Sequence, residues 1–366
     1  MPTTGAGRIE AFLADRIAAG VFPGAGYAVG EGETILARGS VGRAVVTPVS
    51  IPAAPNTLYD LASLTKPLSC ALLAVMLQQE GALRLDDPLA IHLPSWKPRD
   101  ARAGVTLFDL LVHRAGLPAW APMYAHAADR AGWIDWIAAV PLVRPPGEGV
   151  VYSDLGYILL GLALERAGGA SIDRLFSERV ARPLGRDDLI YRPPEALRRQ
   201  TAATETGNAR ERHLAGAAGE GYNGWRTGLI WGEVHDGNAH ALGGAAGNAG
   251  LFGAAEAVAA LGREFLGAGR GLIGGEGRML MARCATEGLQ EHRSAGFQIA
   301  STRGSSAGPA LSPDSFGHTG FTGTSIWIDP GSRRVYVLLT NRVHPRFRDA
   351  DMNGARREFH ALAAGL

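Results

Sequence analysis

The hydrophobic pattern predicts strands near both ends of the chain. Residues 7–20 repeat apolar positions at helical spacing, and two short apolar runs at 24–30 and 33–39 follow on either side of a glycine turn. Near the other end, runs at 324–328 and 333–340 flank Asp-Pro-Gly and predict a hairpin. A sheet that takes strands from both ends of the chain, next to helices, indicates a mixed helix-and-sheet fold.

The middle of the chain has helical periodicity instead. Thr106 and Asp109 form a capping-box pair ahead of an apolar run. Ser153 and Asp154 open a second apolar segment, where serine is a favoured cap and aspartate is favoured in the first turn. These signals predict a mostly helical region over 63–199.

The two patterns together predict the domain organisation. Residues 1–62 and 200–366 form a sheet-and-helix domain, which includes helices at about 254–266 and 349–364. Residues 63–199 form a helical region inserted into it. The fold class is therefore α+β, a central antiparallel sheet flanked by helices, with a cleft between the two parts.

Charge and composition exclude several function classes. The 366-residue chain carries 36 Lys and Arg against 35 Asp and Glu, without a basic block, so no nucleic-acid partner is indicated. The longest apolar run is about ten residues, well short of the ~20 that span a bilayer, so no membrane insertion is expected. The N-terminus does not resemble a signal peptide. We expect a cytoplasmic protein as the sequence stands, or a periplasmic or secreted one if a leader was removed.

The first candidate for chemistry is the pair Ser63 and Lys66, at the start of the apolar run 68–77. Three residues make about one helical turn, so the two side chains lie on one face. A lysine can activate a serine hydroxyl if burial or a helix dipole destabilises its ammonium group. A serine cap beside a solvated lysine would give the same residues. Lysine is rare in this arginine-rich chain, occurring only here and at Lys97, which favours a specific role only slightly.

The second candidate is Tyr152-Ser153-Asp154. A tyrosine hydroxyl beside a lysine ammonium can have its pKa lowered and can carry a proton. Asp154 is stabilised at a helix start whatever else it does. The alternative is structural, with Tyr152 as an amphipathic wall and Asp154 as a cap.

The third candidate is His318-Thr319-Gly320, which precedes the last hairpin. Glycine allows a substrate to approach the backbone closely. The N–H groups of Phe321 and Ser63 could then form an oxyanion hole, while His318 and Thr319 bind a substrate carboxylate or carbonyl. A surface histidine in a turn is the alternative.

The three motifs in this order resemble the penicillin-recognising serine hydrolases. That group includes class C β-lactamases, serine D-Ala-D-Ala carboxypeptidases, D-aminopeptidases and related esterases. The resemblance extends over roughly residues 7–364. It is carried by five segments: 61–66, 85–88, 110–117, 146–156 and 317–323.

The resemblance implies a β-lactamase/transpeptidase-like fold with the site in the cleft. It implies that Ser63 is acylated, that Lys66 is its partner, and that Tyr152 is a general base and then an acid. Either Lys66 or Tyr152 could take the first proton. No cofactor and no metal are implied, and the expected partner is a small-molecule ester, amide or peptide substrate.

Two departures from the family pattern bear on the substrate. Class C β-lactamases have Asn where this chain has Asp154, and Lys where it has His318. A neutral histidine attracts a carboxylate less than lysine does, and an unpaired aspartate repels one. We therefore expect an esterase, or a peptidase or amidase on cell-wall-type peptides, with weak or no β-lactamase activity. A true β-lactamase and a non-catalytic penicillin-type binder or sensor are the alternatives.

Four other features call for a different interpretation. The Gly-x-Ser-x-Gly run at 304–308 lacks a following helix, so we expect a loop there rather than a nucleophile elbow. His235 and His240 lack a third ligand, so hydrogen bonding is expected instead of metal binding. The glycine-rich run at 243–250 is no phosphate loop and is expected to pack near the cleft. Aromatic residues that could line an acyl pocket are Trp120, Tyr124, Tyr222 and Trp225.

Overall fold

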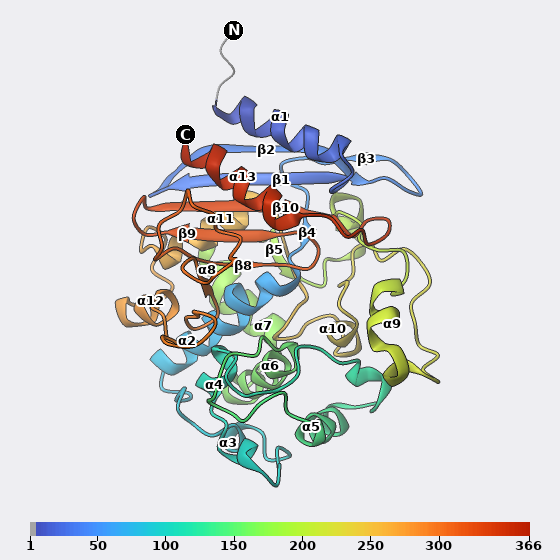
Figure 1. Ribbon diagram of the computed structural model, residues 1–366, viewed down its shortest axis with the longest axis vertical. Helices are drawn as coiled ribbons and strands as arrows, with labels where there is room; N and C mark the ends of the chain where they lie inside the picture. The colour runs from blue at the N-terminus through green and yellow to red at the C-terminus, as the bar shows by residue number, and fades with distance from the viewer. Residues whose placement is uncertain (1–4) are drawn as a thin grey trace.

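A seven-stranded antiparallel sheet forms the centre of the computed structural model, which describes residues 5–366 (Figure 1). The strand order is β3-β2-β1-β10-β9-β8-β7, so the N-terminal strands lie beside the C-terminal ones, as the pattern predicts. Pairing between β1 and β10 sets Ala28 opposite Val337. The strands are β1 Gly24–Glu31, β2 Thr34–Val45, β3 Ile51–Pro52, β7 Gln298–Ile299, β8 Phe316–Thr319, β9 Ser325–Asp329 and β10 Arg334–Thr340.

Helices cover both faces of this sheet. Side chains alternate between the faces of a strand, so Tyr27 packs with α1 (Gly5–Ala18) and α13 (Met352–Ala364), whereas the adjacent Ala28 belongs to the core on the side of α11 (Ala255–Phe265) (Figure 1). Burial on both faces leaves only the last residue of β1 exposed. The predicted α+β class, with a central antiparallel sheet flanked by helices, is confirmed.

The region 63–199 is mostly helical. The predicted capping box is present, with Thr106 Oγ1 accepting from the Asp109 backbone N–H at 3.1 Å. Ser153 caps helix α6 by accepting from the Gly156 N–H at 3.1 Å. The helices are α2 Leu72–Gln79, α3 Leu89–His92, α4 Leu107–Leu111, α5 Arg130–Ala139, α6 Asp154–Gly168, α7 Ile172–Phe176 and α8 Arg182–Leu184.

Helix α6 is the core of this helical layer. Its residues 155–164 are all buried, and it contacts α2, α3, α4 and α7. No single helix among residues 5–366 is long and apolar enough to cross a membrane, although the bent pair α6 and Ile172–Leu184 qualifies by length and composition.

A second sheet connects the two regions and is not predicted by the hydrophobic pattern. It has the order β4-β6-β5 (Tyr59–Asp60, Leu251–Gly253 and Leu189–Tyr191), with strands too short to show a period of two. Strand β8 is also not predicted, because Gly, His and Thr follow its single large apolar residue. The remaining helices are α9 Ala209–Ala215, α10 Gly237–Ala241 and α12 Gly275–Ala282.

Candidate active site

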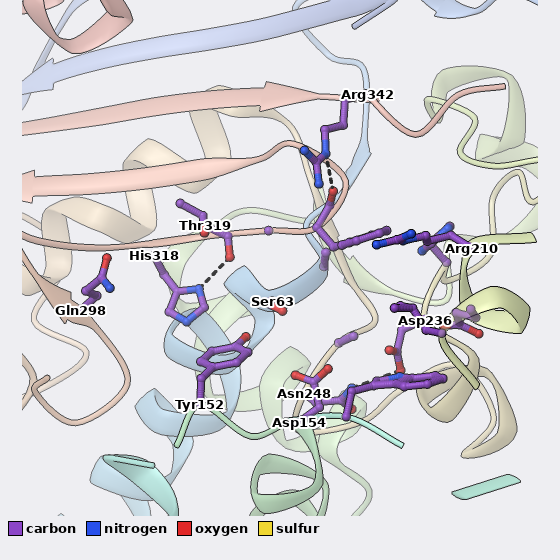
Figure 2. Close-up of a pocket in the computed structure, with 18 of the residues that line it drawn as sticks. Ser63, Tyr152, Asp154, Arg210, Asp236, Asn248, Gln298, His318, Thr319 and Arg342 are labelled. Carbon is purple, nitrogen blue, oxygen red and sulfur yellow. Dashed lines mark hydrogen bonds between the residues drawn. The ribbon is translucent and has the colours of Figure 1, made fainter. Parts of the chain in front are cut away.

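A cavity of about 470 Å³ lies where the end of β8 meets the start of α6 and the segment before α2 (Figure 2). The sequence-predicted residues Ser63, Tyr152 and Asp154 line it, together with 318–321. Lys66 is fully buried beneath Ser63. All three motifs therefore meet at one site, although they are far apart in the sequence.

Backbone strain holds the serine in place. Ala62, immediately before Ser63, has a φ of 49°, a left-handed conformation that costs a non-glycine residue about 1–3 kcal/mol. Asp60 Oδ1 accepts from the Ala62 N–H at 2.8 Å, and the Thr324 hydroxyl donates to the Leu61 carbonyl at 2.9 Å. Both contacts hold the peptide unit between Leu61 and Ala62, so the chain is fixed directly before the strained residue that precedes the serine.

Lys66 is held as a fully donating ammonium group. Its Nζ lies 3.0 Å from Ser63 Oγ, 3.0 Å from the Asn248 carbonyl and 2.6 Å from Asp154 Oδ1. Burial alone lowers the Lys66 pKa, but the charge of Asp154 and the neighbouring Tyr152 raise it above the usual value. The destabilised lysine expected from burial is therefore not what the structure contains, because Asp154 forms an ion pair with it.

The Tyr152 hydroxyl is enclosed near the same lysine. Burial raises its pKa above the usual value, and the Lys66 charge opposes this only in part. Its ring lies 4.6 Å from the His113 ring, and His113 Nδ1 accepts from the Ser153 N–H at 3.0 Å. His113 thus positions the backbone directly after the tyrosine. The His113 backbone itself has a φ of 60°, a left-handed conformation that is strained for a non-glycine residue.

His318 is a neutral imidazole that presents an acceptor. Its Nδ1 donates to the Thr319 carbonyl at 2.8 Å, because a carbonyl can only accept, so Nε2 carries the lone pair. Burial, and then Arg293 and Lys66, hold the His318 pKa well below its usual value. Nε2 is buried without a partner among residues 5–366. In this tautomer the ring offers a substrate an acceptor rather than a donor. The binding of a substrate carboxylate or carbonyl by His318 stays a prediction.

The predicted oxyanion donors are both available. Neither the Ser63 nor the Phe321 backbone N–H has a hydrogen-bond partner in the described part of the chain. Glycine at 320 is required by packing rather than by substrate approach, since a Cβ there would lie 2.6 Å from the Leu61 carbonyl oxygen. Gly320 thereby brings the end of β8 against the residue two before the serine.

Several lining residues carry no motif and are not found from the sequence. Arg293 is 4% exposed, yet its Nε and Nη1 lack hydrogen-bond partners among residues 5–366, and its guanidinium lies 5.1 Å from the Tyr152 ring centroid. Gln298 lines the same end of the cavity, and Asp236 and Asn248 line another part (Figure 2). Of these residues, only Asn248 belongs to a segment that the sequence places near the cleft, the glycine-rich run 243–250.

The structure also places the remaining features that the sequence singled out. Ser306 is buried in an irregular segment, where its Oγ accepts from Trp327 Nε1 at 3.1 Å. His235 pairs with Glu205 at 3.0 Å, and no group of three metal-ligating side chains occurs in the part of the chain that the structure describes. Of the four aromatic residues that could line an acyl pocket, Trp120 lines the cavity.

Comparison with known proteins identifies the family. A family model described as Beta-lactamase matches residues 9–361, nearly the whole chain. The chain belongs to the Beta-lactamase family. The resemblance inferred from the three motifs is therefore confirmed, and the chain is a hydrolase of the β-lactamase fold.

Curated relatives of this Beta-lactamase family member cover most of its length. A protein of Escherichia coli K12 named "Putative D-alanyl-D-alanine carboxypeptidase" is 34% identical over 328 residues, which are 83% of this chain and 73% of the relative. A protein of the same name in Escherichia coli O157:H7 is 31% identical, over 94% of this chain and 84% of the relative. These names describe the relatives.

Solved structures share the fold. "EstCE1, a hydrolase with promiscuous acyltransferase activity" superposes with a TM-score of 0.74 at 21% identity, over 98% of both chains. A penicillin-binding protein homologue from Caulobacter crescentus gives a TM-score of 0.71 at 21% identity, over 99% of this chain and 98% of the other. At these identities the likeness establishes the β-lactamase-type architecture alone.

Proposed function

We propose that this protein is a serine hydrolase that cleaves an ester or amide through an acyl-enzyme on Ser63. The observation that carries the proposal is the contact of Ser63 Oγ with a buried ammonium group, in a cavity that Tyr152 also lines. The Ser63 and Phe321 backbone N–H groups, which have no hydrogen-bond partner among residues 5–366, are the proposed oxyanion donors. A pure ligand binder needs neither the buried lysine nor the tyrosine. The substrate is a small molecule or short peptide that fits this cavity.

Tyr152 is the proposed proton acceptor. The three protons of Lys66 are directed at Ser63, Asn248 and Asp154, so the amine has no lone pair to offer. As a phenolate, Tyr152 takes the proton of Ser63 while Oγ attacks the carbonyl carbon, and as a phenol it returns that proton to the leaving group. Water then hydrolyses the Ser63 ester by the same route. The oxyanion is stabilised by the two backbone N–H groups.

One observation favours esters over β-lactams, which carry a carboxylate. Asp154 does not discriminate between them, because its own carboxylate is paired with Lys66 at 2.6 Å. The third-motif residue, His318, is neutral and presents an acceptor. Arg293 is the buried cation at that end. Its Nη2 pairs with Glu291 at 2.7 Å, but its Nε and Nη1 have no partner among residues 5–366, which supports a peptide with a carboxylate on its leaving group as the second candidate substrate.

A panel of three substrates tests this proposal. We expect wild-type protein to cleave nitrophenyl butyrate and to hydrolyse a chromogenic cephalosporin weakly or not at all, with a D-Ala-D-Ala peptide as the third substrate. Ser63→Ala and Tyr152→Phe should each lower ester kcat by at least about 100-fold. A fast cephalosporinase rate would favour the β-lactamase alternative, and an unchanged ester rate in Ser63→Ala would remove the proposal.

A further inference from the structure

The cavity has two chemically different ends on either side of Ser63. Tyr152, His318 and Gln298 lie on one side in Figure 2, and Asp236 lies on the other, with Asn248 hydrogen-bonded to it. Tyr152 must reach the leaving group to protonate it, so the leaving group belongs on the tyrosine side. The end with Asp236 therefore takes the acyl part of the substrate.

Asp236 is a carboxylate with unused capacity. Its Oδ1 accepts from the Ala239 N–H at 2.7 Å and from Asn248 Nδ2 at 3.1 Å. Its Oδ2 makes no hydrogen bond, and the side chain has no ion-pair partner among residues 5–366. A negative charge that lines a substrate cavity is thus left without a counter-ion.

Asn248 supplies an independent indication of a missing donor. The residue is 1% exposed, and its Nδ2 must point at Asp236 because a carboxylate can only accept. This fixes the amide orientation and leaves Oδ1 as a buried acceptor without a partner in the described chain. A buried acceptor that lines a cavity and lacks a donor indicates that a ligand supplies one.

The other charged groups at this end are held by hydrogen bonds or lie over aromatic rings. Glu211 accepts from the Gly237 N–H at 2.7 Å and from Asn208 and Tyr124, and burial raises its pKa to about 7. Arg342 donates to the Phe321 carbonyl at 2.9 Å. The Arg342 guanidinium lies over the rings of Phe321 and Phe347, at 5.4 and 5.2 Å from their centroids. Arg210, the other arginine at this end of the cavity, lies over the Phe347 ring at 4.9 Å, and its Nε is buried without a hydrogen-bond partner among residues 5–366.

We propose that Asp236 and the Asn248 side-chain oxygen bind a protonated amine on the acyl part of the substrate, so that the enzyme acts on α-amino-acyl esters or amides. An ammonium group supplies both the missing positive charge and the missing donors, which a neutral hydroxyl would not. Trp120 and Leu214 line the same cavity and offer apolar contact to the amino-acyl side chain. This inference rests on the proposed hydrolase function and specifies its substrate class.

Two matched esters test the inference. Leucine p-nitrophenyl ester carries the amine, and 4-methylpentanoic acid p-nitrophenyl ester has the same skeleton without it. At pH 6.5, where the amine is protonated, we expect wild-type protein to favour the better enantiomer of the amino ester by at least about tenfold in kcat/KM. In Asp236→Asn the ratio of the two kcat/KM values should fall about 10- to 100-fold, as for the loss of one charge-assisted hydrogen bond.

Asp351→Asn is the matched control, because Asp351 also caps a helix, accepting from the Gly354 N–H at 2.7 Å, and does not line the cavity. It should leave the ratio unchanged. Equal wild-type rates on both esters, or an unchanged ratio in Asp236→Asn, would overturn the inference while leaving the hydrolase proposal intact. If the wild-type protein cleaves neither ester, or cleaves both no faster than the Ser63→Ala variant does, the hydrolase proposal fails as well. The wild-type comparison decides the matter even if Asp236→Asn does not fold.

Discussion

Replacing Asp154 with asparagine should move the pH dependence of catalysis to lower pH. The change removes a negative charge while keeping the shape of the side chain. In the wild-type protein the Tyr152 pKa is raised first by burial, and the Asp154 charge raises it further. The same carboxylate pairs with Lys66 and so cancels the positive charge that would stabilise a Tyr152 phenolate.

The size of the effect follows from the geometry. Asp154 Oδ1 lies 2.6 Å from Lys66 Nζ, which lies 5.1 Å from the Tyr152 ring centroid, so the carboxylate is within about 8 Å of the ring. A unit charge at about 8 Å contributes about 2 kcal/mol at an effective dielectric constant of about 20, or about 1.5 pKa units. The ascending limb of kcat/KM should therefore shift downward by about one to two pH units, with about a tenfold gain in ester cleavage at pH 7 for each unit.

The assay is the pH profile of kcat/KM for nitrophenyl butyrate between pH 6 and 10. Wild-type activity should rise across the whole range, because the Tyr152 pKa lies above 10. Asp154→Asn should reach its plateau earlier, whereas Asp129→Asn, an exposed helix cap outside the cavity, should follow the wild-type curve. If the ascending limb of the kcat/KM profile stays in place or moves to higher pH in Asp154→Asn, the assignment of Tyr152 as the base is refuted.

Further variants test the supporting residues. Arg293→Gln should raise KM about tenfold for a peptide with a carboxylate on its leaving group and leave nitrophenyl butyrate unaffected; equal effects on both would contradict the leaving-group role. His113→Ala leaves the Ser153 N–H without an acceptor and so displaces Tyr152. In ester kinetics the factor by which kcat falls should exceed the factor by which KM rises by about 100. Gly320→Ala places a Cβ 2.6 Å from the Leu61 carbonyl oxygen and should lower the free energy of unfolding by about 1–3 kcal/mol in urea titrations, with retained stability as the contrary result. In Asp154→Asn the buried Lys66 loses its partner, so the protein should lose about 3–5 kcal/mol at pH 7. In the wild type the Lys66 pKa is raised, so the stabilisation it contributes is complete below the unfolded pKa of about 10.5. The stability deficit of the variant should therefore stay constant up to about pH 10.5 and narrow only above it, as the pH rises toward the folded pKa.

The sequence predicts the architecture where the pattern is periodic. The apolar residues of the long strands β1 and β10 alternate or form a continuous run, and those of α1 repeat at helical spacing. These elements can therefore be predicted from the sequence alone. The small sheet does not, because two- and three-residue strands such as Tyr59–Asp60 carry no periodicity. Those short strands are ordered by tertiary hydrogen bonds, among them the Leu61 N–H to the Leu251 carbonyl at 2.9 Å.

The site divides in the same way. Ser63, Tyr152 and His318 belong to short motifs that become a predicted site only together, through their resemblance to a known family. The ion pair between Lys66 and Asp154 is a tertiary contact, and it reverses the pKa shift that burial alone predicts. Arg293 and Asp236 have no local signal at all, since arginine and aspartate are common in this chain and only packing brings these two to the cavity.

Acylation of Ser63 is the step on which the proposed function depends. Incubation with a fluorophosphonate, followed by digestion and mass spectrometry, measures this acylation directly. We predict one adduct on the peptide that contains Ser63, and no adduct in Ser63→Ala. Modification at Ser306, or no adduct on folded wild-type protein, would contradict this prediction.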